Sequence, residues 1–190
     1  DERIVARQLK RALIQRIQSS DFDPSGKLSP ARLRELIGET SLVVTASSAH
    51  STTPASNAAD GDPTTLWHTD WTTGEKLPAE LTIDLLGPKP ILGIRCTPRK
   101  DMENGRVSDF HIEVSNDGSK WLKIATKGKL ANSGNAQEIH FNDPIKARYL
   151  RLHMLRDHGN RGFASMAEIE PLLGDPGDVR DLGIIPGFND

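Results

Sequence analysis

The chain has 190 residues, with 24 Lys and Arg against 26 Asp and Glu, and its formal net charge is −2. This balance excludes the concentrated basic field of a nucleic-acid-binding protein. Cys96 is the single cysteine, so an internal disulfide and a cysteine-based structural zinc site are excluded, and no apolar run approaches the ~20 residues of a membrane helix.

Residues 1–38 are predicted to form a helical hairpin, because apolar residues recur at helical spacing before and after a polar loop. The loop has the oxygen-bearing residues that begin an EF-hand, but Arg32 stands where a bidentate Glu should be. We therefore interpret the segment as a degenerate EF-hand-like hairpin. A helix–turn–helix capped by Ser29, or the end of an upstream domain, is the alternative. The matching loop residues are Asp21, Asp23, Ser25, Gly26 and Ser29.

The pattern changes near Thr40 to short β-like runs separated by turn residues. About eight strands without intervening helices predict an all-β fold, a β-sandwich of jelly-roll type over residues 39–173. Residues 174–190, rich in Pro and Gly, are expected to be a C-terminal tail or linker. The predicted strands are 42–46, 81–85, 91–97, 110–115, 121–126, 138–141, 149–155 and 166–172.

The stretch from His50 to Ala79 has little periodicity, and a loop of that length in a compact domain is usually functional or held by something. Asp60, Asp62 and Thr65 bring hard oxygen ligands together in it, and Gly61 lets the backbone curl between the carboxylates. The residues alone allow two interpretations, a structural calcium site or an Asx-turn in which the carboxylates cap backbone amides.

Four segments resemble, in order, the discoidin or coagulation-factor type C domain, and most closely its branch of bacterial family 32 carbohydrate-binding modules. Residues 59–68 read ADGDPTTLWH, and Pro98 and Arg99 are followed by Asn104 and Gly105. Residues 113–121 read EVSNDGSKW. The fourth segment combines ARYLR at 147–151 with FASMAEI at 163–169. The resemblance implies a galactose-binding-domain-like sandwich.

The resemblance also implies a set of site residues. Calcium would be held by the carbonyl groups of Asn57 and Ala167 and the side chains of Asp60, Asp62, Thr65 and Glu168. For a galactose-type sugar, the hydrogen-bonding groups would be His68, Arg99 and Asn104, with Phe163 as stacking platform and Trp71 as flanking wall. Ser51 departs from the pattern, because many relatives have an acidic residue near it.

Other conspicuous residues are assigned to the core or to no function. Trp67, Trp121, Tyr149 and Cys96 are expected to be buried. The strand histidines His111, His140 and His153 show no ligand-like partners in the sequence.

The predicted function is a non-catalytic carbohydrate-binding module for galactose-type glycans, stabilised by calcium and tethered to other domains of a larger extracellular, periplasmic or cell-surface glycan-active protein. No nucleophile elbow or catalytic triad is found in the sequence, which argues against an enzyme. Nucleic acid and membrane insertion are not expected. The alternative is an adhesion-type discoidin domain that binds a protein or lipid surface.

Overall fold

The computed structural model describes most of the predicted sandwich. The described residues are 42–174 except Glu75 and 122–124, together with Ala12, Gln15, Arg16 and Ser19. The predicted hairpin and the tail beyond Gly174 therefore lie outside the described residues, apart from those four positions. Among the described residues, no helix has the length and apolar character needed to span a bilayer.

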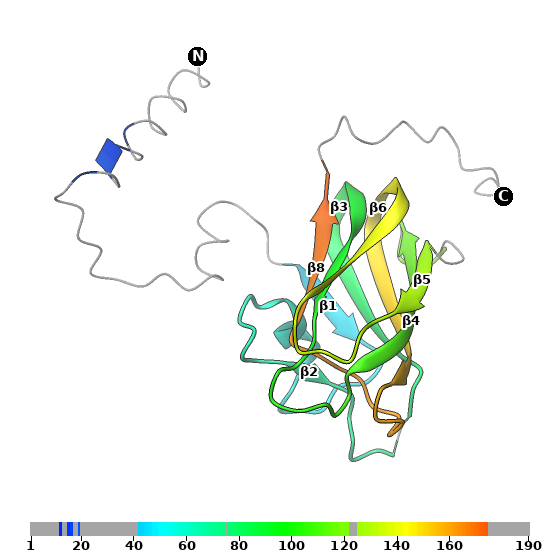
Figure 1. Cartoon of the computed structure of the whole chain (residues 1–190). Helices are drawn as coiled ribbons and strands as arrows, with labels where there is room; N and C mark the ends of the chain where they lie inside the picture. Colours follow the sequence, from blue (N-terminus) through cyan, green and yellow to red (C-terminus); the bar gives the residue numbers. More distant parts are fainter. Residues whose placement is uncertain are drawn as a thin grey trace.

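Among the described residues, the domain consists of eight strands and one short 3-10 helix, and Figure 1 labels every strand except β7. In chain order these are β1 (Val43–Ala46), η1 (Ala55–Ala59), β2 (Trp67–His68), β3 (Ala79–Thr97), β4 (Val107–Ser115), β5 (Thr126–Lys129), β6 (Gln137–Asp157), β7 (Ser165–Met166) and β8 (Glu168–Leu173).

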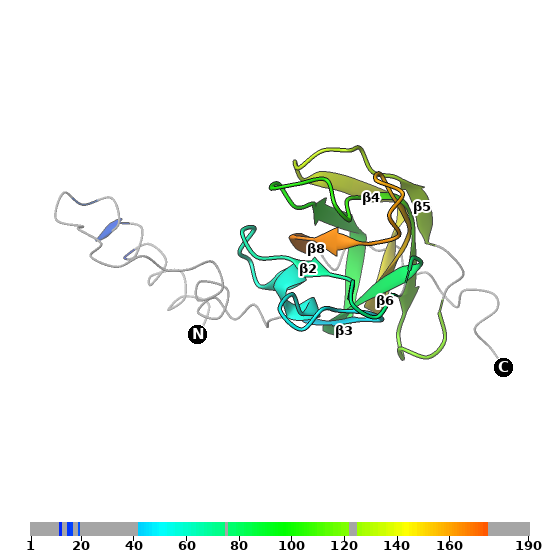
Figure 2. The same ribbon diagram turned by 90° about the horizontal axis from the view of Figure 1, so that it is seen from below.

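Two long strands, β3 and β6, bend and take part in both layers of the sandwich (Figures 1 and 2). Residues 79–84 of β3 pair with β1 and with the second half of β6, which continues the layer to β4 and β5. Residues 91–97 of β3 pair with β8 and with the start of β6. All these pairings are antiparallel, which confirms the predicted all-β sandwich.

The bends correct two details of the strand prediction. The runs predicted separately at 81–85 and 91–97 are one strand, and so are the runs at 138–141 and 149–155. The turn predicted at Asn142, Asp143 and Pro144 lies inside β6. A register shift in the β3–β6 pairing between Asp84 and Lys89 shows how the chain changes layer without a loop.

The core forms from the side chains that face inward in an alternating pattern. Phe110, Ile112 and Val114 are buried as predicted, and Trp67 is fully buried. Cys96 is also fully buried, and burial raises the pKa of its thiol to about 12, which removes it as a nucleophile at neutral pH.

Two aromatic residues predicted for the core are only half-buried. The guanidinium of Arg151 lies 3.9 Å from the ring centre of Trp121, and the ring of Tyr149 meets Trp121 edge-on. Arg151 lies between two buried neighbours on β6, so it points to the outer face of the sheet. Trp121 and Tyr149 therefore cover an outward-facing polar surface.

The loops that contain the predicted site residues all leave the sandwich at the same end. Strand pairs Ala46–Leu81, Ala79–Met154, Val107–Asp157 and Thr97–Glu168 all lie at that end. The loops that leave it are residues 47–78, 98–106 and 158–167, and they contain every residue predicted to bind sugar or calcium except Glu168 at the first position of β8.

Candidate functional site

A small second sheet joins the loop at residues 47–78 to the loop at residues 158–167. β2 pairs with β7, so that His68 lies opposite Ser165. Beyond the sheet, the backbone amide of Thr69 donates to the carbonyl of Ala164 at 2.9 Å, and Ala164 donates back to the Thr69 hydroxyl at 3.1 Å. These bonds fix the chain segments that carry Trp71 and Phe163 relative to each other.

Gly105 fixes the third loop to the same place. The amide of Ser165 donates to the carbonyl of Gly105 at 2.8 Å, and the Ser165 hydroxyl donates to the carbonyl of Asn104 at 3.1 Å. Gly105 has a φ of 77°, and a Cβ at this position would lie 2.8 Å from Ser165 Oγ. Both the conformation and the close approach require glycine, which explains why Asn104 is followed by this residue.

His68 has a defined protonation state at the centre of the site. It is 2% exposed, and its Nδ1 lies 2.7 Å from the carbonyl of Thr69, which can only accept. Burial lowers the pKa of His68 against the effect of that hydrogen bond, and the charges of Arg99 and His50 lower it further. The neutral ring therefore carries its proton on Nδ1 and offers the Nε2 lone pair.

Asn104 completes this arrangement. Its Nδ2 lies 3.2 Å from His68 Nε2 and acts as the donor, because that nitrogen is the acceptor. The other side-chain atom, Oδ1, is buried and has no hydrogen-bond partner among the described residues. A buried acceptor left in this state is a place where a ligand hydroxyl or a water molecule is expected to donate.

Aromatic rings surround His68 on two sides. The ring centre of Trp71 lies 5.1 Å away in an edge-on contact, and that of Phe163 lies 5.8 Å away. Trp71 is 44% exposed and stacks on His50 at 3.6 Å, while Lys76 Nζ lies 4.1 Å from the centre of the half-buried Phe163 ring. One face of each ring is therefore already in contact with a side chain of the protein.

Arg99 is held at the edge of this group by a partner that the sequence analysis missed. Asp101 accepts from Nε at 2.7 Å and from Nη2 at 2.6 Å, and the Arg99 side chain is only 10% exposed. The hydrogen bonds of Arg99 to Asp101 use Nε and Nη2 and leave Nη1 without an acceptor among the described residues. An acidic residue two positions after the arginine was the available signal.

Asp157 is a second organising residue that was missed. It is 6% exposed and accepts from the backbone amides of Arg161 and Gly162 at 3.0–3.1 Å. The turn that it holds leads directly to Phe163 and carries the carbonyl of Arg161, to which Lys76 donates. Asp157 therefore fixes the Phe163 loop from the end of β6.

The predicted calcium loop has a donor set made of oxygen atoms. Thr65 Oγ1 lies 2.7 Å from Asp60 Oδ2, to which it donates, and 3.0 Å from the Asp62 carbonyl oxygen, which brings three oxygens together. Asp60 Oδ1 and Asp62 Oδ1 accept from backbone amides, as an Asx-turn would require. The Asx-turn hydrogen bonds are therefore present, and the calcium site stays a prediction.

The far side of this loop is the start of β8. The helix η1, whose C-terminal cap is Asp60, packs against β8. Glu168, the first residue of β8, is a buried carboxylate with 5% exposure. Asn57 donates its side chain to the Leu66 carbonyl, and Ala167 donates its amide to Thr97. Oxygen donors of this kind fit calcium, although the Asp62 carboxylate is turned toward Thr64.

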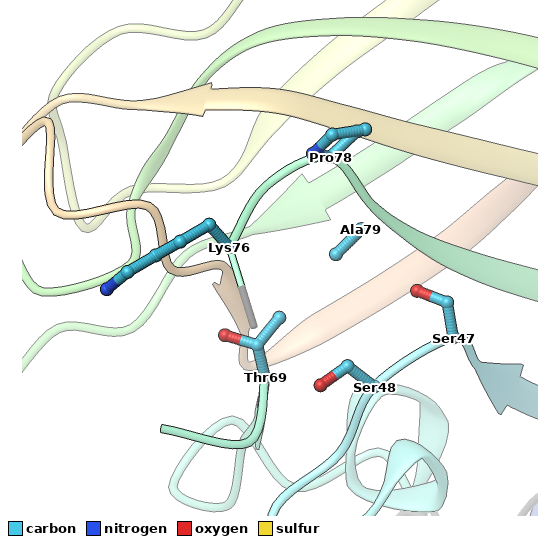
Figure 3. Close-up of a pocket in the computed structure, with 6 residues that line it drawn as sticks. All are labelled: Ser47, Ser48, Thr69, Lys76, Pro78 and Ala79. Carbon is cyan, nitrogen blue, oxygen red and sulfur yellow. The ribbon is translucent and has the colours of Figure 1, made fainter. Parts of the chain in front are cut away.

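A separate small cavity lies beside the aromatic group (Figure 3). It has a volume of about 270 Å³ and is lined by Ser47, Ser48, Thr69, Lys76, Pro78 and Ala79. None of the five residues predicted to bind sugar lines it. In the group around His68, Trp71 is the exposed member, while His68 itself is buried.

Comparison with known proteins identifies the domain. The sequence pattern of the F5/8 type C domain matches residues 43–169. The chain belongs to the F5/8 type C domain family. The matched range contains every residue predicted here to bind sugar or calcium, and it covers the described sandwich from the start of β1 to the second residue of β8.

Solved structures relate this F5/8 type C domain to family 32 carbohydrate-binding modules. It is similar to the module of Clostridium perfringens NanJ, solved in complex with galactose, at 28% identity and a TM-score of 0.64, covering 69% of this chain and 93% of that one. A second C. perfringens family 32 module, in complex with GalNAc-β-1,3-galactose, is 32% identical with a TM-score of 0.66, covering 70% and 95%.

Among curated proteins, a sialidase of Micromonospora viridifaciens is 34% identical over 119 residues, which is 61% of this chain. The match spans 18% of the sialidase, so the similarity is to one part of a much larger enzyme.

In this F5/8 type C domain, His68, Asn104, Trp71 and Phe163 form one group, and Arg99 lies beside it.

Proposed function

We propose that this domain is a non-catalytic carbohydrate-binding module that binds a galactose-type sugar at the loop tips. The observation that carries the proposal is the contact of His68 with Asn104 between two aromatic rings, with the buried Oδ1 of Asn104 left as an acceptor. The two family 32 modules solved with galactose-containing ligands support the choice of sugar.

The side chains suit the two faces of a pyranose. Hydroxyls can accept from Arg99 Nη1 and donate to Asn104 Oδ1, and the apolar C–H face of the ring can rest on an aromatic side chain. Phe163 is proposed as the platform and the more exposed Trp71 as the wall of the site. Lys76 contacts the ring of Phe163, and His50 stacks on the ring of Trp71. These contacts hold the two rings in place.

Calcium is proposed as a structural ion in the loop that contains η1. Asp60, Thr65 and the carbonyl or carboxylate of Asp62 would bind it on one side, and Glu168 with the carbonyls of Ala167 and Asn57 on the other. Its role would be to hold the long loop against β8, and thereby to fix His68 and Trp71. No chemistry at the sugar is assigned to the ion.

The domain is proposed to serve as a tethered part of a larger glycan-active protein outside the cytoplasm, at the cell surface or in the periplasm. The sialidase match over a small fraction of that enzyme supports this context. A weakly binding module gains effective concentration when it is linked to a second binding or catalytic unit.

A second candidate function is adhesion to a protein or lipid surface. Trp71 is 44% exposed and Met102 is 50% exposed, and they lie on two of the loops at the site. Exposed apolar side chains at loop tips suit insertion into another surface. Binding to liposomes or to protein-coated surfaces, without saturable binding to sugar, would favour this function.

The test is galactose binding by calorimetry, with a glycan array to define the preferred sugar. Arg99→Ala and Phe163→Ala should abolish binding while leaving the circular dichroism spectrum and the melting temperature close to those of the wild type. Arg95→Ala is the matched control, because Arg95 pairs with Glu138 and Glu170 on the sheet. Equal sugar binding by wild type, Arg99→Ala and Phe163→Ala would refute the site.

A further inference from the structure

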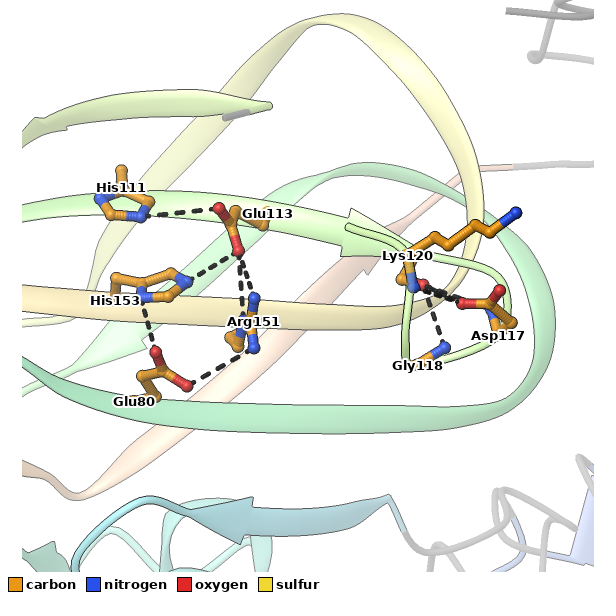
Figure 4. A network of polar contacts seen from close by, with 9 residues as sticks. Glu80, His111, Glu113, Asp117, Gly118, Lys120, Arg151 and His153 are labelled. Atoms are coloured by element: carbon orange, nitrogen blue, oxygen red, sulfur yellow. Dashed lines mark hydrogen bonds and ion pairs between the residues drawn. The ribbon is translucent and has the colours of Figure 1, made fainter. Parts of the chain in front are cut away.

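A group of charged and imidazole side chains lies on the outer face of the larger layer, apart from the loop site (Figure 4). It consists of Glu80 on β3, Arg151 and His153 on β6, and His111 and Glu113 on β4. Each of these residues alternates along its strand with buried apolar neighbours, so all five point away from the core.

Strand register brings these residues together although they are far apart in sequence. His153 lies directly opposite Glu80 on one side and His111 on the other, and Arg151 lies opposite Glu113. The two imidazole rings stack with centres 4.1 Å apart and planes at 21°. Side chains at directly opposite positions are the closest neighbours on a sheet face, so the backbone itself fixes this cluster.

We propose that His111, Glu113 and His153 bind a divalent cation of the zinc type. One ligand atom from each of the three residues lies within 4.8 Å of the others. His153 Nε2 is 2.9 Å from Glu113 Oε2, and His111 Nε2 is 4.0 Å from Glu113 Oε1. Two imidazoles and one carboxylate are a donor set that zinc uses with a fourth position left open.

The spacing is close to that of a metal centre. Bonds of about 2.0–2.1 Å to zinc place tetrahedral ligand atoms roughly 3.3 Å apart. The distance of 2.9 Å between His153 Nε2 and Glu113 Oε2 is shorter than this value, and no distance between the ligand atoms exceeds 4.8 Å. An ion would therefore draw the side chains together by at most about 1.5 Å. The three side chains are 12–20% exposed, so an ion can reach them from solvent.

Residues around the three proposed ligands fix the orientation of these side chains, as residues that hydrogen-bond to the ligands do in known metal sites. His153 Nδ1 lies 3.1 Å from Glu80 Oε1, so this carboxylate holds the proton on Nδ1 and turns Nε2 toward Glu113 and His111. Arg151 donates to Glu113 Oε2 at 2.6 Å, and Trp121 covers the guanidinium. The other carboxylate oxygen of Glu113, Oε1, faces His111.

The charges of the cluster also suit a cation. Glu80 and Glu113 carry two negative charges against the guanidinium of Arg151 when both imidazoles are neutral, and the ammonium-bearing Lys127, opposite His111 on β5, is exposed to solvent. The cluster shares no residue with the proposed calcium loop, and its two nitrogen donors distinguish it from that all-oxygen site. Calcium and zinc should therefore occupy the two places selectively.

The experiment is a zinc titration of the full chain by calorimetry, after chelator treatment and in the presence of excess calcium to fill the oxygen site. We expect one zinc ion per chain. His111→Ala should weaken zinc binding by at least about 100-fold, because it removes one of three ligands. Glu80→Gln should weaken it by roughly 10- to 100-fold, because it acts through His153.

His111→Ala is chosen because it leaves the contact of His153 with Glu80 and the ion pair of Arg151 with Glu113 in place, and hence the fold. His140→Ala is the matched control, since His140 also contacts a carboxylate, that of Glu138 at 3.2 Å, in an exposed pair without a second imidazole. Zinc binding unchanged in His111→Ala, reduced equally in His140→Ala, or absent from the wild type would overturn the proposal. Cobalt absorption in the visible range would report the geometry of the bound ion.

Discussion

Asn104 donates its side-chain amide to Nε2 of His68 at 3.2 Å, although the two residues are 36 positions apart in the chain. His68 can accept because its proton is held on the other nitrogen by the carbonyl of Thr69. The contact therefore sets the direction of the Asn104 amide and leaves the buried Oδ1 without a donor among the described residues. Three of the predictions below concern residues that create or preserve this relationship.

Asn104→Ala should weaken galactose binding by roughly 10- to 100-fold, because it removes a buried acceptor and exposes the His68 lone pair without a donor. Calorimetry of both proteins with galactose measures the loss. Asn132→Ala is the control, since Asn132 lies on a neighbouring loop and contacts Glu103 and Arg106. Full affinity in Asn104→Ala would remove this residue from the site.

Stability should fall as the pH drops below about 6.5, the ordinary pKa of histidine, because burial lowers the pKa of His68 in the folded state. Between these two pKa values the unfolded chain binds a proton that the folded chain does not, so acid favours unfolding. The contribution is fully present above the unfolded pKa. Urea unfolding at pH 7.5 and near pH 5 should therefore show a smaller decrease in His68→Gln than in wild type. An identical decrease in both proteins would contradict this protonation state.

Gly105→Ala should reduce both stability and sugar binding, and Gly74→Ala is a closely matched control. The φ angles are 77° and 76°, so both substitutions incur a similar backbone cost of about 1 kcal/mol. A Cβ at Gly74 meets nothing within 4 Å, whereas one at Gly105 lies 2.8 Å from Ser165 Oγ. We expect a further loss of about 1–3 kcal/mol for Gly105→Ala in denaturant unfolding. Equal losses would show that the loop adapts.

Chelator should lower the melting temperature of the wild type if calcium holds the η1 loop to β8. An ion present at a hundredfold excess over its dissociation constant contributes about 2.7 kcal/mol, which corresponds to a shift on the order of 10 °C. Calorimetric melting with EDTA, and then with calcium restored, measures the effect.

Asp60→Asn should abolish that response to chelator, because it removes a carboxylate from the oxygen cluster. Asp70→Asn should keep it, since Asp70 makes the same kind of turn with Thr72 that Asp62 makes with Thr64, outside the cluster. A melting temperature that is insensitive to EDTA in the wild type would refute the calcium proposal.

Local patterns predicted the sandwich well and its long-range pairing poorly. The alternation of Phe110, Ile112 and Val114 predicts a strand with one buried face, and these residues are buried in β4. The same local signals wrongly divided β6, because Asn142, Asp143 and Pro144 are common in turns and equally compatible with a bend between layers.

The site residues show the same division. Motifs predicted His68, Arg99 and Asn104 as site residues, and the structure places His68 and Asn104 in contact, whereas the stacking of His111 on His153 was not predicted. These two histidines are 42 positions apart, and only the register of β4 on β6 makes them direct neighbours. Register depends on the packing of whole strands against the core, which a single sequence does not display.

The positions of β1 and β8 beside β3 determine where the chain enters and leaves the domain. Val43, at the start of β1, pairs with Asp84, and Leu173, at the end of β8, pairs with Ile91, so the chain enters and leaves the domain close to the bend of β3 (Figure 1). The loops around His68 lie at the opposite end. A linker attached on either side would therefore hold the domain at the end away from His68 and leave these loops directed outward.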